Sequence, residues 1–130
     1  SGARRLVAAG KSMGGRIASQ MAAEGRLPVE GLIFLGYPLH PADDPSRLRD
    51  AHLYRITIPM LFFAGTRDRL CALGKLQAVL GRLTGTWRLD VIEGGDHSFQ
   101  LPKAMGVAQS EVFARIADTS LRWLGATFAD

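Results

Sequence analysis

Short apolar segments alternate along this chain with segments that repeat apolar residues at helical spacing, and this alternation limits the fold more than any other feature. We expect four strands, at Arg4–Ala9, Leu32–Tyr37, Pro59–Gly65 and Trp87–Ile92. Helical periodicity predicts helices over Gly14–Glu24, Ala72–Leu83 and Ala108–Leu124, and a short helix within Ser46–Leu53. The order predicts an α/β fold, in which a parallel sheet of about four strands has right-handed crossovers and flanking helices.

Two of the expected strands differ from a third in how their apolar residues are arranged. Leu32–Tyr37 and Pro59–Gly65 are almost continuously apolar, which is typical of parallel strands covered on both faces. Trp87–Ile92 alternates apolar and polar residues, which favours a place near an edge of the sheet.

The composition is that of one ordinary domain, residues 1–130, with 47% hydrophobic and 22% charged residues. The apolar runs are the length of strands, not of membrane spans, so we expect no membrane partner. Cys71 is the only cysteine, so an internal disulfide cannot form, and a cytoplasmic location is the default. We expect the Cys71 side chain to act as a small buried hydrophobe.

The net charge of +4 raises the question of nucleic-acid binding. The basic residues are scattered from Arg4 to Arg122, and no aromatic residues are interleaved with them as a base-stacking platform would require. We therefore expect a solvated surface and no nucleic-acid partner.

Residues Gly10–Gly14 read Gly-Lys-Ser-Met-Gly and lie between the first expected strand and the first expected helix. In this context a G-x-S-x-G sequence predicts a nucleophile elbow, in which Ser12 occupies a sharp strand-to-helix turn. The backbone N–H of Met13 would then lie near the helix N-terminus and could stabilise an oxyanion. The alternative is a glycine-rich turn with an incidental serine. A phosphate-binding loop is excluded, because Arg5 occupies the position of its first glycine.

An acidic residue and a histidine follow the last two expected strands. Asp68 comes directly after Pro59–Gly65 in Gly-Thr-Arg-Asp, where it could orient an imidazole or simply cap the next helix. His97 lies in a glycine-rich loop beside Asp96, but adjacent side chains usually diverge, so Asp68 is the better partner. Serine, aspartate and histidine thus each follow the carboxyl end of a strand, where α/β sheets bind ligands. Of the other histidines, we expect His40 to line the site and His52 to face solvent.

Four segments of the chain resemble one branch of the α/β-hydrolase superfamily: GKSMGGR, LGYPLHP, GTRD and GGDHSF. This branch contains bacterial dienelactone-hydrolase-like proteins, the testis-expressed hydrolase-like protein and the NSL-complex regulatory subunit. The resemblance implies a nucleophile at Ser12, an acid at Asp68 and a base at His97. True dienelactone hydrolases use cysteine as the nucleophile, so the serine argues against their substrate here.

Family members have further strands before the nucleophile strand, so the resemblance implies that this chain is the C-terminal portion of the domain. A missing N-terminal segment or a homo-oligomer would then complete the sheet. We expect a serine hydrolase that acts on a small carboxylic ester or related acyl substrate and needs no cofactor or metal. The alternative is a non-catalytic scaffold or protein-interaction module. The candidate substrate-lining residues are Tyr37, Leu39, His40 and Phe99.

Overall fold

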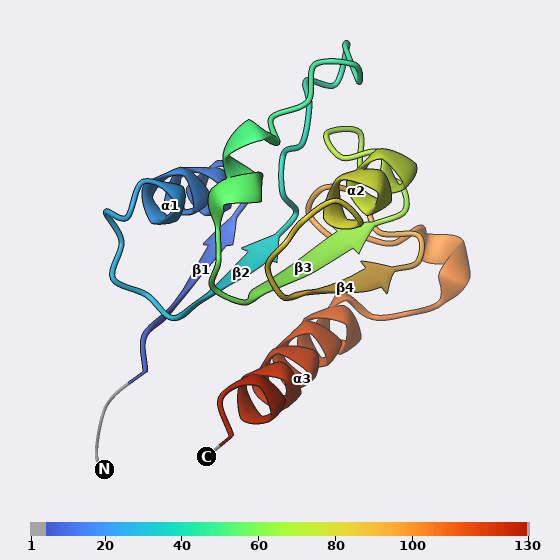
Figure 1. The fold of residues 1–130 in the computed structure, drawn as a ribbon. Helices are drawn as coiled ribbons and strands as arrows, with labels where there is room; N and C mark the ends of the chain where they lie inside the picture. Colours follow the sequence, from blue (N-terminus) through green and yellow to red (C-terminus); the bar gives the residue numbers. More distant parts are fainter. Residues whose placement is uncertain (1–4, 130) are drawn as a thin grey trace.

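A computed structural model describes residues 5–129 of the chain. Four parallel strands form one sheet in the order β1-β2-β3-β4 (Figure 1). They are β1 (Val7–Lys11), β2 (Gly31–Leu35), β3 (Met60–Gly65) and β4 (Trp87–Ile92). The predicted α/β fold with a four-stranded parallel sheet is confirmed, and the alternating strand, β4, lies at an edge.

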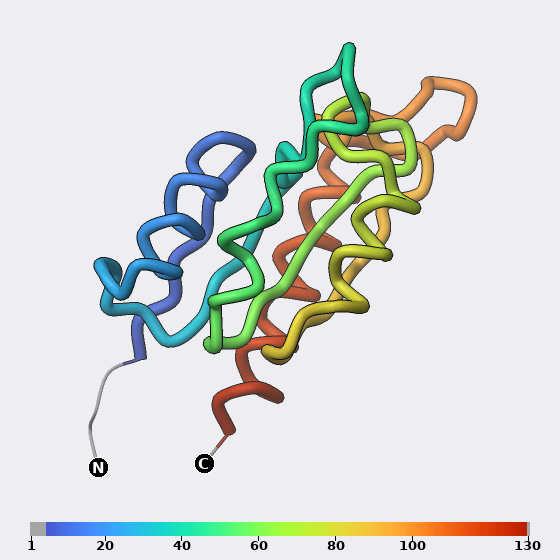
Figure 2. The backbone as a smooth tube through the Cα atoms, turned by 45° about the horizontal axis from the view of Figure 1, so that its top comes forward, coloured from blue at the N-terminus to red at the C-terminus, as the bar shows by residue number. Residues whose placement is uncertain are grey.

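Helices cover both faces of the sheet (Figures 1 and 2). One face carries α1 (Met13–Ala23), the 3-10 helix η1 (Ala51–Arg55) and α2 (Leu73–Leu80). The other face carries α3 (Gln109–Thr127), which follows a short 3-10 helix, η2 (Lys103–Met105). This three-layer arrangement explains the continuous apolar runs, because successive side chains of a strand point to opposite faces and both faces are buried.

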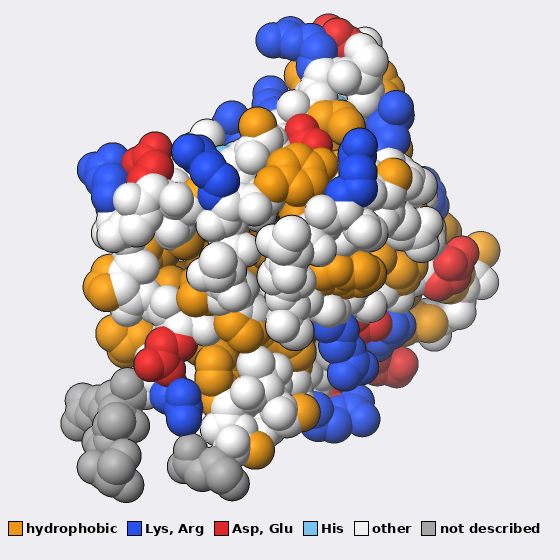
Figure 3. All heavy atoms as spheres, viewed as in Figure 1, with side chains coloured by type: hydrophobic (Ala, Val, Ile, Leu, Met, Phe, Trp, Pro, Cys, Tyr) orange, Lys and Arg blue, Asp and Glu red, His pale blue; other side chains and the backbone are white. Residues whose placement is uncertain are grey.

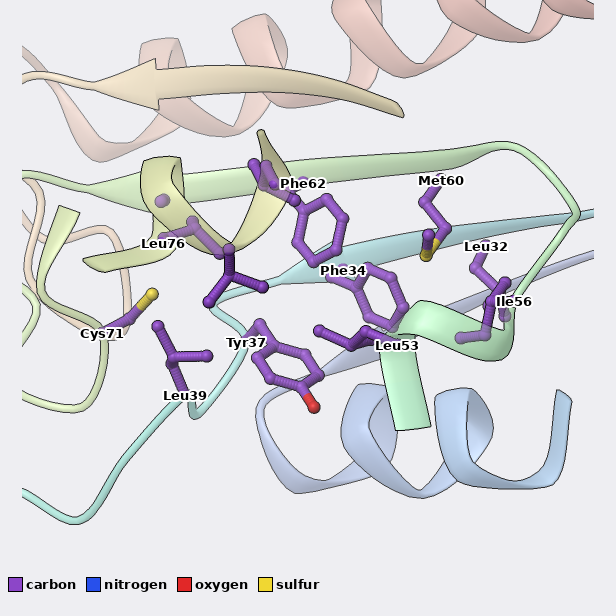
Figure 4. Close-up of a cluster of buried hydrophobic side chains, with 13 residues drawn as sticks. Leu32, Phe34, Tyr37, Leu39, Leu53, Ile56, Met60, Phe62, Cys71 and Leu76 are labelled. Carbon is purple, nitrogen blue, oxygen red and sulfur yellow. The ribbon is translucent and has the colours of Figure 1, made fainter. Parts of the chain in front are cut away.

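The core beneath α1, η1 and α2 is built around three aromatic rings (Figure 4). The ring centroids of Phe34 and Phe62 lie 4.5 Å apart, and Tyr37 meets the edge of the Phe34 ring at 5.4 Å. Aromatic pairs of this kind contribute about 0.5–1.5 kcal/mol each beyond the area that they bury. The core on the α3 side uses the intervening strand residues, such as Ile33 and Leu61, with the Trp123 side chain.

The first strand ends later than the sequence predicted. Gly10 and Lys11 pair with Phe34 and Leu35 of β2, so the strand runs on to the residue before Ser12. Arg4, the predicted first residue of this strand, lies outside the described residues.

The short helix within Ser46–Leu53 was placed too early. A 3-10 helix covers Ala51–Arg55 instead, and the preceding segment forms turns. Asp44 explains the shift, because its Oδ1 accepts hydrogen bonds from the N–H and the hydroxyl of Ser46. Such local bonds compete with helix formation.

The surface mixes charged and apolar groups. On the face shown in Figure 3, basic side chains lie in separate groups, several of them beside acidic ones. Leu6, Met13 and Ile17 are about half exposed, and they lie on or next to β1 and α1. In the described part of the chain, no helix is long and apolar enough to cross a membrane.

Candidate active site

Ser12 occupies a strained turn between β1 and α1. Its backbone has φ 51° and ψ −121°, a combination that non-glycine residues rarely adopt. The Ser12 N–H donates to the carbonyl of Leu35, and the Ser12 carbonyl accepts from the N–H of Arg16. The neighbouring strand and the first turn of the helix therefore hold this residue in an unfavourable conformation. That is the conformation a nucleophile elbow requires.

Two glycines allow the turn to be this tight. A Cβ at Gly10 would lie 2.4 Å from the backbone nitrogen of Gly15, and a Cβ at Gly15 would lie 2.8 Å from the carbonyl oxygen of Gly10. A Cβ at Gly14, by contrast, would meet nothing within 4 Å. The tight turn thus requires glycine at the first position of the motif and at Gly15, but not at Gly14.

Three side chains from distant parts of the chain form a continuous line of hydrogen bonds. Ser12 Oγ lies 2.7 Å from His97 Nε2, and His97 Nδ1 lies 2.8 Å from Asp68 Oδ2. The carboxylate can only accept, so Nδ1 carries the hydrogen and Nε2 is left to accept the proton of Ser12. The Asp68 side chain is fully buried, whereas the His97 side chain is 24% exposed.

The two carboxylates near His97 have different partners. Asp68 Oδ1 accepts from the N–H of Leu70 at 2.8 Å, which leaves Oδ2 for the imidazole. Asp96 Oδ1 accepts from the N–H groups of Ser98 and Gln100, both at 2.9 Å. Asp96 therefore shapes its own loop, and among the described residues no hydrogen bond joins it to the imidazole.

Glycines at the carboxyl ends of β2 and β3 make room for the histidine loop. A Cβ at Gly65 would lie 2.1 Å from the carbonyl oxygen of Gly95. Gly36 has φ +75°, and a Cβ there would lie 3.0 Å from the carbonyl oxygen of His97. Gly65 allows the backbone after β3 to pack closely against the histidine loop, and the available signal was a glycine at the end of an expected strand.

The backbone N–H of Met13 belongs to the first residue of α1. The first N–H groups of a helix have no partner within it, and they lie at the positive end of the helix dipole. This N–H directly follows Ser12, as an oxyanion donor would.

The four candidate substrate-lining residues are buried in the folded chain. Their exposed fractions are 2% for Tyr37, 0% for Leu39, 2% for His40 and 3% for Phe99. Tyr37 and Leu39 belong to the core beneath α1 and α2, and Phe99 belongs to the core on the α3 side. They follow the carboxyl ends of β2 and β4, but core packing has buried their surfaces.

His40 connects two loops. Its Nδ1–H donates to the carbonyl of Pro41 at 2.8 Å, and its Nε2 accepts from the N–H of Ala72 at 2.9 Å. Its own backbone N–H donates to the carbonyl of Leu70 at 3.1 Å. His40 is thus a buried link to the loop that contains Asp68, not a wall of the site.

His52, predicted to face solvent, is buried, with 9% of its surface exposed. Its Nε2 lies 2.6 Å from Ser19 Oγ and 3.2 Å from the hydroxyl of Tyr37. The two hydroxyls donate to backbone carbonyls, Ser19 to Arg16 and Tyr37 to Arg49. His52 Nε2 must therefore carry the hydrogen and donate it to both oxygens. The prediction was wrong because η1, which contains His52, packs against α1, and this contact buries the ring.

Burial also sets the charge of this second histidine. Removal from water lowers the pKa of His52 below its usual 6.5, and the nearby positive charges of Arg16 and Arg55 lower it further. The neutral imidazole is therefore favoured in the folded protein.

A cavity of about 340 Å³ adjoins His97. It is lined by Arg67, Arg69, Asp96, His97 and Ser98. Another cavity, of about 260 Å³, lies between β4, η2 and α3 and is lined by none of the three hydrogen-bonded residues. Open space next to the imidazole is thus available for a ligand. Neither arginine was predicted as a site residue, although both are adjacent to Asp68 in the sequence.

Cys71 is buried, with 1% exposed, as expected. Burial, and secondarily the charge of Asp68, raises the pKa of the thiol to about 12, so the unreactive thiol form prevails. Within residues 5–129, no group of three or more His, Cys, Asp or Glu side chains could hold a metal ion.

A family model described as the alpha/beta hydrolase domain matches residues 1–125. Among solved structures, a dienelactone hydrolase from Anabaena variabilis is 24% identical, with a TM-score of 0.65. The alignment covers 95% of this chain and 50% of that one. A predicted CIB-like hydrolase from Thermoplasma acidophilum is 22% identical, with a TM-score of 0.63, and the alignment covers 91% of this chain and 51% of that one.

Est1E from Butyrivibrio proteoclasticus, solved with bound ferulic acid, is 16% identical, with a TM-score of 0.67. The alignment covers 98% of this chain and 61% of that one. At these identities the likeness shows a common fold. The chain spans about half the length of the solved structures that it matches.

Proposed function

This chain belongs to the alpha/beta hydrolase family, and we propose that it is a serine hydrolase that cleaves small carboxylic esters or related acyl compounds. The observation that carries the proposal is the line of hydrogen bonds from Ser12 through His97 to Asp68, with distances of 2.7 and 2.8 Å. A serine on a strand-to-helix turn, an imidazole and a buried carboxylate in this order are suited to nucleophilic catalysis.

In the proposed reaction, His97 Nε2 accepts the Ser12 proton as Oγ attacks the substrate carbonyl. The Met13 N–H donates to the negatively charged oxygen that develops in the tetrahedral intermediate. The imidazolium then protonates the leaving alcohol, and the acyl group remains on Ser12. A water molecule, deprotonated by the same imidazole, hydrolyses the acyl-enzyme and restores the serine.

Asp68 has two effects in this scheme. Its Oδ2 accepts from His97 Nδ1–H, which fixes the tautomer and orientation of the ring. Its negative charge also stabilises the imidazolium that forms when the serine is deprotonated. Complete burial of the carboxylate keeps water from competing for this hydrogen bond.

The cavity beside His97 suggests the kind of substrate. It is lined by two arginines and other polar side chains, so we expect a small polar or acidic ester in preference to a long apolar one. The LGYPLHP and GGDHSF segments support placing the protein in the branch with dienelactone-hydrolase-like proteins. A serine in place of cysteine argues for a different substrate.

A non-catalytic scaffold of the same fold is the alternative. A scaffold has no functional need for a strained serine, an imidazole and a buried acid that are joined by hydrogen bonds. The intact hydrogen-bonded line therefore favours the hydrolase.

A fluorophosphonate probe tests the proposal directly, because it reacts with activated serines. We expect it to label Ser12 in the full-length protein, and Ser12→Ala to abolish labelling. Ser98→Ala is a matched control, since Ser98 is exposed and lines the cavity beside His97. Mass-spectrometric mapping of the adduct to another serine would reject the assignment, and the absence of any adduct would favour the scaffold.

A further inference from the structure

We propose that His40 is a positioning residue for Asp68, and that its buried imidazole holds the acid-bearing loop in the geometry that catalysis needs. This inference rests on the proposed function. His40 contacts neither Ser12 nor His97 through any hydrogen bond that the described residues form. Its effect would pass through the backbone of residues 70–72.

His40 forms two hydrogen bonds with the loop that follows Asp68, one as donor and one as acceptor. The backbone N–H of His40 donates to the carbonyl of Leu70 at 3.1 Å. Two residues further on, the N–H of Ala72 donates to His40 Nε2 at 2.9 Å. His40, which follows β2, therefore satisfies the carbonyl of Leu70 and the N–H of Ala72 in the loop that follows Asp68.

Leu70, whose carbonyl accepts from His40, is also the residue that orients the acid. The N–H of Leu70 donates to Asp68 Oδ1 at 2.8 Å. The carbonyl of the same residue is held by His40. With Oδ1 fixed in this way, the other carboxylate oxygen, Oδ2, points to His97 Nδ1. A shift of the Leu70 backbone would therefore move the carboxylate that holds the catalytic imidazole.

The His40 ring is itself fixed in one state. Its Nδ1 lies 2.8 Å from the carbonyl oxygen of Pro41, which can only accept, so Nδ1 carries the hydrogen. Nε2 then carries no hydrogen, and its lone pair accepts from the N–H of Ala72. Because only 2% of the surface of His40 is exposed, solvent has little access to replace these partners. Loss of the acceptor would leave the Ala72 N–H without its partner, which is unfavourable.

The role requires an acceptor at the position of Nε2, and this suggests the variants. Leucine fills similar space but accepts nothing. Glutamine places its Oε1 near the position of Nε2, so it can accept from Ala72. We expect His40→Leu to lower kcat about 10- to 100-fold, since small misplacements of catalytic groups have effects of this size. KM should stay within about twofold of wild type, because the change does not touch the substrate. His40→Gln should recover most of the lost kcat.

A double-mutant cycle with Asp68→Asn separates positioning from general loss of structure. If His40 acts through Asp68, His40→Leu should have less than about a twofold effect on kcat in the Asp68→Asn background, because the interaction is already lost. His52→Leu is the matched control, since it also removes a buried, hydrogen-bonded histidine. It should reduce stability and retain most of kcat.

A proton NMR measurement provides a readout that needs no turnover. The hydrogen between His97 Nδ1 and Asp68 should give a downfield signal, which should shift or broaden in His40→Leu and return in His40→Gln. Equal losses of kcat in the two His40 variants, fully multiplicative effects with Asp68→Asn, or an unchanged NMR signal in His40→Leu would each overturn the inference. Failure of the proposed function would look different: wild-type protein would show neither ester hydrolysis nor labelling of Ser12.

Discussion

The molecule contains two serine–histidine pairs with almost the same separation, and they have different surroundings. Ser12 Oγ lies 2.7 Å from His97 Nε2, and Ser19 Oγ lies 2.6 Å from His52 Nε2. Both serines belong to the same short stretch of chain, one directly before α1 and the other within it. Distance alone would not tell which of the two is a candidate nucleophile.

The direction of the hydrogen bond distinguishes them. The Asp68 carboxylate fixes the hydrogen of His97 on Nδ1, so Nε2 accepts the proton of Ser12. No carboxylate is hydrogen-bonded to His52 among the described residues. The Ser19 proton instead goes to the carbonyl of Arg16 at 2.6 Å, and His52 Nε2 donates. One imidazole can act as a base toward its serine, and the other cannot without rearrangement.

Solvent access separates the pairs further. His97 is partly exposed and lines a cavity, whereas Ser19 is 0% exposed and is covered by η1. The buried pair joins α1 to the segment between β2 and β3, so it fixes structure. A serine–histidine contact therefore indicates nucleophilic chemistry only where an acid orients the imidazole and the pair is open to solvent.

The largest effect that would sharpen this comparison is removal of the acid. Asp68→Asn should lower kcat on the order of 10⁴-fold, because an amide can donate to Nδ1 and so favours the wrong tautomer of His97. Ester hydrolysis and circular dichroism, measured on the same samples, provide the check. Asp96→Asn is the matched control and should have a much smaller effect on kcat, since Asp96 binds its own loop. A greater loss of kcat in Asp96→Asn, with both variants folded, would mean that the acid is misassigned.

A smaller effect is expected for the buried Ser19–His52 pair, and it should appear in stability instead of in activity. Ser19→Ala removes the nearer of the two acceptors of His52 Nε2–H and leaves only the Tyr37 hydroxyl at 3.2 Å, so it should reduce the free energy of unfolding by about 0.5–1.5 kcal/mol, the net contribution of one hydrogen bond. Urea denaturation measures this change. Fluorophosphonate labelling of Ser12 should persist in the folded variant. Loss of labelling without unfolding would show that the two pairs are coupled, and the comparison would fail.

The smallest expected effect is a pH dependence of stability from His52. Its pKa is lowered in the folded protein from 6.5, so the unfolded state binds more protons just below that pH. The contribution of His52 to stability is therefore fully present above pH 6.5 and decreases as the pH falls through the range below it. Urea denaturation of wild type and His52→Gln across this range should give a weaker pH dependence for the variant. Equal slopes would contradict the prediction.

Much of the fold could be read from the chain. The continuous apolar runs of β2 and β3 predicted buried parallel strands, and the alternation in β4 predicted an edge strand. Local competition accounts for the errors: the turn at Asp44 and Ser46 displaced the short helix. Pairing with β2 extended β1 past Gly10, where sequence alone suggested an end.

The candidate site was predicted in part. Ser12, Asp68 and His97 were expected together, and hydrogen bonds join them; their role in catalysis stays a prediction. The expected wall residues Tyr37, Leu39 and Phe99 are instead in the core, because burial depends on contacts between segments far apart in sequence.

The sequence by itself determined the parallel α/β fold and brought a serine, an acid and a histidine to the same edge of the sheet. The carboxyl ends of parallel strands lie on the same side of a sheet, and each of these residues follows such an end. The local sequence pattern was therefore sufficient to predict that they lie close together. Only the tertiary structure decided that Ser12 and not Ser19 faces an accepting imidazole. It also decided that Asp68 and not Asp96 orients that imidazole, and that His40 and His52 are buried links. These outcomes depend on tautomers, burial and backbone partners, which arise only when distant segments pack together.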